Sequence, residues 1–198
     1  LEVNMGQAEV LTVRGDRSNA ALLRFDLSCL PAAATVAEAT LRLYVTRAPA
    51  ESLRIRVDRL LRPWHETDVT WRQAARGELW GLPGAAHEGT DRASSSIEAS
   101  LPGGATGWIA LPVTELVQAW LDNPAANYGV VLYADGSADA ECAFASAESR
   151  QMGLRPSLVI HLAQPTLGAL RLPSGTPGVD DIVPTATPSP LPTSASPL

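Results

Sequence analysis

Apolar and polar residues alternate along most of this chain, with a period of two residues. Such alternation is typical of β-strands with one buried face. It predicts strands at residues 9–13, 21–27, 40–45, 53–58, 107–111, 128–133, 141–146 and 156–162. Many short strands separated by turn residues indicate an all-β fold, an antiparallel β-sandwich of jelly-roll-like arrangement.

Residues 112–122 follow a helical period instead. Their apolar side chains fall at i, i+3, i+4, i+7 and i+8, as expected of an amphipathic helix of about three turns. These side chains are Val113, Leu116, Val117, Trp120 and Leu121. The pair Asn123-Pro124 ends the helix, because proline disfavours helical geometry at the residue before it. We expect this short helix to cap one open end of the sandwich.

Two segments lack a clear period. Residues 76–104 are rich in Gly, Ala and Ser, so we expect a long loop region, where sandwich proteins usually carry function. Residues 165–198 hold half of the 16 prolines, many Ser and Thr, and no aromatic residue. The sequence therefore predicts a sandwich domain at 1–164 and an extended tail or linker at 165–198.

The tail also bears on localisation. Tracts of Thr, Pro and Ser are typical of exported surface proteins and can carry O-glycans, with Thr185, Thr187 and Thr193 as candidate acceptors. The chain begins at Leu1 rather than at methionine, which we interpret as a processed product. We expect an extracellular protein, secreted or attached to the cell surface.

The charged residues restrict the partners. The net charge is −6 and all 15 basic residues are arginine, so a nucleic-acid partner is not expected and lysine chemistry is excluded. No apolar run reaches the roughly 18–20 residues of a membrane helix. Motifs of nucleophilic or phosphate chemistry are also missing from the sequence, so we expect no enzyme activity and no cofactor.

Three local patterns each allow two interpretations. Cys29 and Cys142 either form one disulfide, stabilising by roughly 3–5 kcal/mol in the chain-entropy model, or remain free thiols. Asp135, Asp139 and Glu141 alternate in a way that calcium could use, although Asp-Gly between two strands is first of all a hairpin turn. Residues 14–16 read Arg-Gly-Asp, an adhesion tripeptide that also occurs by chance at hairpin tips.

Tryptophans raise the question of a ligand. Aromatic rings stack on the apolar faces of sugars, but large aromatic side chains are more often buried. Trp64 and Trp71 bracket one short segment, to which we assign a structural role. Trp80 and Trp108, in or beside the predicted loop region, are the candidate ligand residues, with Arg76 nearby.

The order of motifs resembles the DNRLRE domain, which is related to carbohydrate-binding module family 96. The motifs that carry the resemblance are Asn4-Met5-Gly6, Leu23 to Leu27, Ala39 to Val45, Trp64 to Trp71, Asn127 to Leu132, Phe144 to Glu148 and Arg155 to Ile160. The resemblance implies an exported, non-catalytic sandwich module, of which some members bind acidic polysaccharide. Members usually have one further strand before the first motif, whereas this chain begins almost at that motif.

Two functional hypotheses follow. The first is a surface module that binds polysaccharide. The second is a filament or surface-layer subunit, in which copies exchange strands through the open N-terminal edge and the tail. The segment 166–172 alternates weakly and is the candidate donor strand.

Overall fold

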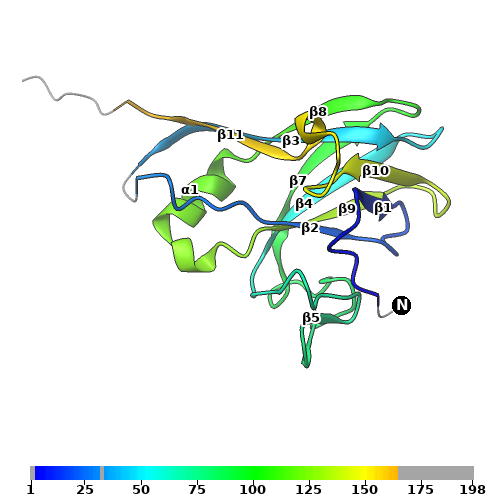
Figure 1. Ribbon diagram of the computed structural model, residues 1–198, viewed down its shortest axis with the longest axis horizontal. Helices are drawn as coiled ribbons and strands as arrows, with labels where there is room; N and C mark the ends of the chain where they lie inside the picture. Colours follow the sequence, from blue (N-terminus) through cyan, green and yellow to red (C-terminus); the bar gives the residue numbers. More distant parts are fainter. Residues whose placement is uncertain (1–2, 32–33, 165–198) are drawn as a thin grey trace, which may run out of the picture. The chain divides into compact units, whose positions relative to one another are not determined.

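The computed structural model describes residues 3–31 and 34–164, which belong to the compact unit Leu1–Gln164. Two antiparallel β-sheets pack face to face in this unit, with one short α-helix (Figure 1). The predicted β-sandwich is confirmed. The predicted tail, the candidate O-glycosylation residues and the segment 166–172 lie outside the described residues.

Sheet A has five strands. Its order is β1 (Val10–Arg14), β10 (Glu141–Ala145), β3 (Val36–Arg47) and β11 (Ser157–Leu162), and β8 (Gly107–Pro112) pairs with the other side of β3. The strand β3 has 12 residues, and along one side it pairs first with β11 and then with β10. Among the described residues, β1 therefore forms a free edge of sheet A.

Sheet B has four strands in the order β2 (Ala21–Leu23), β9 (Val130–Asp135), β4 (Leu53–Leu60) and β7 (Arg92–Leu101). Within the described part of the chain β2 pairs only with β9, so it forms a free edge there, and both β2 and β1 line the same groove. The prediction of a strand over residues 21–27 was too long, because regular pairing stops at Leu23.

The core lies between the two sheets and is formed by alternate residues of their strands. Its largest fully buried side chains include Leu43, Leu53, Ile55, Leu111, Leu132 and Phe144. Burying a side chain of this size stabilises the fold by roughly 1.5–3 kcal/mol. The alternation of apolar and polar residues in the sequence thus corresponds to the side chains that are buried in this core and those that are not.

Helix α1 (Thr114–Asp122) confirms the predicted helix, and Val117, Trp120 and Leu121 are its buried residues. It packs beside β3 near one end of the sandwich (Figure 1). The side chain of Gln118 accepts a hydrogen bond of 2.7 Å from the backbone N–H of Val36, which joins the helix to the start of β3. Short 3-10 helices follow at η1 (Pro124–Ala126) and η2 (Met152–Leu154).

Residues 61–91, here called the Trp loop, project below sheet B in Figure 1. They contain the small strands β5 (Gln73–Ala75) and β6 (Glu78–Leu79). A second core cluster joins the Trp loop to the outer face of sheet B; its members are Leu60, Trp64, Ala74, Trp80, Ala85, Val131 and Tyr133. The Trp loop is therefore a packed part of the domain.

The prediction of one long loop at residues 76–104 was wrong in its second half. Residues 92–101 form β7, which pairs with β4 along nearly its whole length. Alanine and serine have weak strand propensity, but pairing with a buried neighbour strand overrides local propensity. Ile97 and Leu101 supply the apolar contacts of β7 with the core.

Candidate functional site

A groove of about 530 Å³ opens along the side of the sandwich where β1 and β2 are free edges. We call it the open-edge groove. Its walls come from residues 3–8, β1, β2, the Trp loop and the segment after β10. The apolar lining includes Val3, Met5, Val10, Leu11, Leu22, Trp64, Val69, Trp71, Trp80 and Ala147. The cavity is large enough for several side chains of a partner.

Residues 3–8, the N-terminal turn, are attached to the Trp loop. The side-chain amide of Asn4 donates to the carbonyl oxygens of Glu66 and Val69, at 2.6 and 2.8 Å. The side-chain oxygen of Asn4 (Oδ1) accepts from the backbone N–H of Gly6 at 3.0 Å. A side chain at Gly6 would come within 2.8 Å of the Glu66 carbonyl oxygen, which explains the glycine.

The attachment of this turn leaves apolar side chains in solvent. Val3 is 53% exposed and Met5 is 67% exposed, and both border the open-edge groove. Exposed apolar side chains at a concave site are typical of a binding surface.

Two of the tryptophans that line the groove use their indole N–H groups inside the domain. The indole N–H of Trp64 donates to the carbonyl oxygen of Tyr128 at 2.8 Å, and that of Trp80 donates to the carbonyl oxygen of Thr70 at 3.2 Å. In these two rings only the carbon atoms are then available to a partner. Trp71 packs against Gly84, where a Cβ atom would lie 2.4 Å from the ring.

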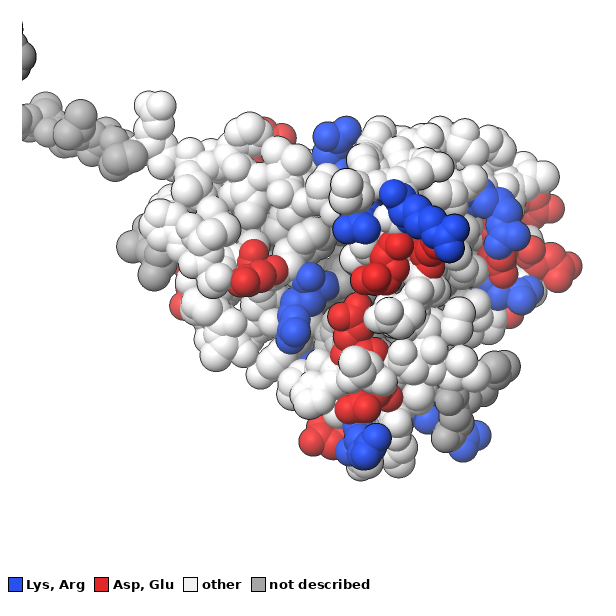
Figure 2. All heavy atoms as spheres, viewed as in Figure 1, with Lys and Arg blue, Asp and Glu red and all other residues white. Residues whose placement is uncertain are grey.

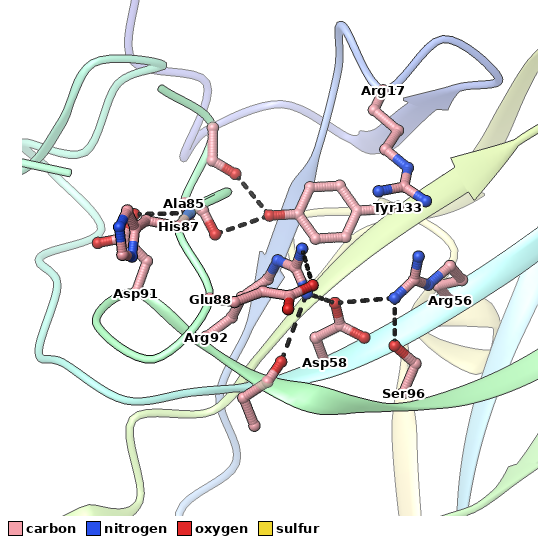
Figure 3. Close-up of polar contacts among 12 residues, drawn as sticks. Arg17, Arg56, Asp58, Ala85, His87, Glu88, Asp91, Arg92, Ser96 and Tyr133 are labelled. Atoms are coloured by element: carbon pink, nitrogen blue, oxygen red, sulfur yellow. Dashed lines mark hydrogen bonds and ion pairs between the residues drawn. The ribbon is translucent and has the colours of Figure 1, made fainter. Parts of the chain in front are cut away.

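A buried polar network holds the Trp loop against sheet B (Figure 3). The Tyr133 hydroxyl lies 2.9 and 2.8 Å from the carbonyl oxygens of Gly84 and Ala85, to which it donates. Burial raises the pKa of Tyr133 to about 12. The phenol is therefore neutral at physiological pH and acts as a donor to the loop.

Arginine and acidic side chains complete this network. Arg92 donates to the fully buried carboxylate of Asp58 at 2.8 Å and to Glu88 at 2.9 Å, and Arg56 lies 3.7 Å from Asp58 (Figure 3). Asp91 is also fully buried, and its carboxylate accepts backbone N–H bonds within the loop. Charges buried in this way require partners, so the network orders the loop rather than performing chemistry.

The groove itself carries little charge. Among the described residues, Glu66 and Glu148 are the charged ones that line it, and no histidine, cysteine or arginine does so. Over the face drawn in Figure 2, acidic side chains of the described residues form a band down the centre, and basic side chains lie beside it. The site is suited to contact with apolar and basic groups of a partner, not to reaction chemistry.

The structure does not bring the three candidate ligand residues together. Trp80 is buried against sheet B, Arg76 is exposed at the turn between β5 and β6, and Trp108 is on the outer face of sheet A. Trp108 is 39% exposed, with Tyr44 edge-on at 5.4 Å and the Arg42 guanidinium 4.6 Å from its ring centroid. Of the three, only Trp80 lines the groove.

The candidate calcium residues are also not assembled. The Asp135 carboxylate accepts from Arg17, with one contact of 2.9 Å, and Glu141 pairs with Arg47. Arg17 holds the pKa of Asp135 below its ordinary value through its hydrogen bonds. Among the described residues, no group of three potential ligands is arranged to hold a metal ion. Asp135 and Glu141 are thus engaged by arginines, while Asp139 is exposed.

Of the two interpretations of Cys29 and Cys142, the structure shows the free thiols and no disulfide between them. Both thiols are free, with Cys29 exposed and Cys142 buried inside sheet A. Burial raises the pKa of the Cys142 thiol to about 12, which makes it unreactive near neutral pH. The positions of the two cysteines in the fold decide between a disulfide and free thiols. The spacing of the cysteines in the sequence does not show these positions.

The Arg-Gly-Asp tripeptide is held by its surroundings. Arg14 donates to the carbonyl oxygen of Ala138 at 3.0 Å, and a side chain at Gly15 would come within 2.3 Å of Ser137. Asp16 accepts from the hydroxyl and the N–H of Ser18, which lowers the pKa of Asp16. These contacts explain the tripeptide as part of the connection between β1 and β2.

The open-edge groove was only partly visible to sequence reasoning. The comparison with the DNRLRE pattern suggested an open N-terminal edge, and among the described residues β1 is a free edge of sheet A. Trp71 and Met5 were not predicted as groove residues, since their approach depends on the fold of the Trp loop. The sequence signal that could have pointed to the groove was the apolar residue Met5 inside the turn motif Asn4-Met5-Gly6, where no strand period explains it.

The fold and the groove define a β-sandwich domain with a concave apolar edge and no assembled catalytic centre among its described residues. Residues 3–161 match the family model described as TGF-beta propeptide, so the chain belongs to that family. It is a non-catalytic propeptide of a secreted precursor. A search of the curated proteins gave no match.

This match confirms the predicted secretion and the lack of enzyme activity, and it corrects the family assignment. The resemblance to the DNRLRE domain was wrong, because its motifs are strand and turn patterns that many sandwiches share. The two functions inferred from it, polysaccharide binding and strand exchange between copies in a filament, are wrong as well. Among the described residues, no helix is long and apolar enough to cross a bilayer.

Proposed function

We propose that this chain is the prodomain of a secreted growth-factor precursor, and that the open-edge groove binds the growth-factor domain of that precursor without a covalent bond. The proposal is carried by one observation. An apolar groove of about 530 Å³ opens at two free strand edges of a chain that belongs to a propeptide family.

The chemistry of the groove supports a protein partner. Its rings and aliphatic side chains give a mainly apolar contact area, and Trp and Met are enriched at the centres of protein interfaces. Its two carboxylates, Glu66 and Glu148, favour a partner with a basic residue near the bound segment.

The groove is also fixed before a partner binds. Asn4 attaches the N-terminal turn to the Trp loop, and Tyr133 attaches that loop to sheet B. A site ordered in advance loses less conformational entropy on association, so the same contacts give higher affinity.

The test is to produce the full chain together with the growth-factor domain of its precursor and to measure their affinity by calorimetry. Met5→Asp places a charge at the groove and is expected to weaken binding by at least about tenfold, as for a contact residue worth more than about 1 kcal/mol. Leu79→Asp is the matched control, because Leu79 is 66% exposed, against 67% for Met5, and lies outside the groove.

If neither Met5→Asp nor Leu79→Asp weakens the affinity, the growth-factor domain binds to a surface other than the open-edge groove. No complex with the unmodified chain would reject the proposed function itself.

A further inference from the structure

The chain has two methionines, and their surroundings differ. Met5 is 67% exposed and Met152 is 74% exposed, so solvent reaches both side chains. Met5 lines the open-edge groove, whereas Met152 lies in η2 and outside the groove. Neither cysteine lines the groove. Among the described residues, the thioether of Met5 therefore supplies the groove with its only sulfur atom.

The backbone around Met5 is held in place. The carbonyl oxygen of Met5 accepts from the N–H of Ala8 at 2.9 Å. On the other side, the side-chain amide of Asn4 donates to two carbonyl oxygens of the Trp loop at 2.6 and 2.8 Å. Met5 thus keeps its place at the groove as long as the N-terminal turn stays attached to the Trp loop.

We propose that Met5 is a site of reversible oxidation, and that its sulfoxide closes the open-edge groove to the growth-factor domain. This inference rests on the proposed function. The oxidant is hydrogen peroxide. The sulfur lone pair attacks one peroxide oxygen and the O–O bond breaks. The proton on that oxygen passes to the departing hydroxide, so the sulfur is oxidised by two electrons and the products are the sulfoxide and water.

A sulfoxide does not suit this groove. It is polar and chiral, whereas the thioether is apolar and flexible. A partner in the groove removes the sulfoxide oxygen from water, and burying a polar group without a hydrogen bond is unfavourable. Among the described residues, no arginine or histidine lines the groove to donate to that oxygen, and the charged lining residues Glu66 and Glu148 are acidic.

Oxidation acts on the free chain. In the complex the growth-factor domain covers Met5, so peroxide is kept from its sulfur, while Met152 stays exposed. The modification therefore prevents association and does not dissociate a complex that has already formed. Reductases that return methionine sulfoxide to the thioether reopen the groove.

The first test compares affinities before and after oxidation. The full chain alone is treated with dilute hydrogen peroxide, the peroxide is removed, and mass spectrometry of peptides follows both methionines. Calorimetry with the untreated growth-factor domain then gives the ratio of Kd after oxidation to Kd before it. This ratio is expected to be at least about ten for the unmodified chain, because the oxidised groove must desolvate a polar group.

Two variants serve as matched controls. The ratio should stay at least about ten for Met152→Leu and fall to about one for Met5→Leu. Because each chain is compared with itself, any effect of Met5→Leu on the starting affinity does not enter. The exposed thiol of Cys29 is present in all three chains, so its oxidation cannot cause the difference. Methionine sulfoxide reductases specific for the two epimers should restore the affinity of the oxidised unmodified chain.

The second test measures protection. At a growth-factor concentration of about ten times Kd, about one chain in ten remains free, so oxidation of Met5 should slow about tenfold. Oxidation of Met152 in the same sample should keep its rate.

Full oxidation of Met5 with unchanged affinity, or an equal loss of affinity in oxidised Met5→Leu, would overturn the oxidation site and leave the proposed function intact. Lack of any complex between the untreated chain and the growth-factor domain would reject the proposed function instead.

Discussion

The carboxylate of Asp91 is fully buried and is enclosed by the backbone of the Trp loop. It accepts N–H bonds from Gly81, Leu82 and His87 at 2.8, 3.0 and 3.1 Å. One side chain thus accepts hydrogen bonds from three backbone N–H groups. These groups have no partner in a regular helix or sheet, because the loop is irregular there. At the scale of the residue, buried polar groups decide the shape of this loop.

Replacement of Asp91 by alanine should therefore lower the free energy of unfolding by about 3 kcal/mol or more, because three buried donors lose a charged acceptor. Urea denaturation followed by tryptophan fluorescence measures the loss. Glu51→Ala, at an exposed position, is the control and should stay within about 0.5 kcal/mol of the unmodified chain. Equal stabilities would mean that other contacts hold the loop.

Tyr133 makes a prediction about pH. Its pKa is raised from 10.0 to about 12, so the neutral form is favoured in the folded state. The resulting stabilisation is complete below pH 10 and is lost as pH rises toward 12. The difference in phenolate absorbance between the unmodified chain and Tyr133→Phe should therefore titrate near pH 12; a midpoint near 10 would contradict the buried phenol.

At the scale of the element, the Trp loop and the N-terminal turn form one wall of the groove, and glycine permits their close packing. Gly84 has φ of +79°, and a Cβ atom there would overlap the Trp71 ring. No hydrophobic period in the sequence predicts the contact between the Trp loop and the N-terminal turn, or the packing of Trp71 on Gly84. The wall therefore exists only because separate segments meet in the fold.

Gly84→Ala should displace the Trp71 ring and change the groove, in addition to straining the backbone. Gly89→Ala is the matched control, since Gly89 has φ of +86° but no atom within 4 Å of the added methyl group. Both variants lose roughly 1–2 kcal/mol from the left-handed conformation, so a larger loss and a shifted tryptophan emission are expected for Gly84→Ala alone. Identical behaviour of the two variants would show that ring packing is unimportant.

At the scale of the whole molecule, a net charge of −6 and the acidic rim of the groove favour a basic partner. Electrostatic attraction between partners speeds association and weakens with salt. The charged rim should therefore control the rate of complex formation more than the lifetime of the complex.

The double variant Glu66→Gln and Glu148→Gln should associate more slowly with the growth-factor domain and depend less on salt than the unmodified chain. Surface plasmon resonance at two ionic strengths measures both effects. The exposed residue Glu51, which does not line the groove, provides the control as Glu51→Gln. An unchanged salt dependence in the double variant would mean that the rim does not face the partner's charge.

The period of two residues determined the sandwich, because burying alternate side chains is the main stabilising contribution to strands such as β3 and β4. The period of 3.6 likewise determined α1. β7 escaped sequence reasoning, since its alanines and serines form a strand only through pairing with β4. The motif pattern also suggested the wrong family, because strands and turns recur in unrelated sandwiches.

The groove and the buried network were decided by tertiary structure alone. Asn4 meets Glu66 and Val69, and Tyr133 meets Gly84, across long separations in sequence. A sequence records which residues prefer burial, but not which distant segments will share a surface. The sequence by itself therefore determined most of the strands and their buried faces, while folding decided β7, the pairing of the strands and where the sandwich stays open to a partner.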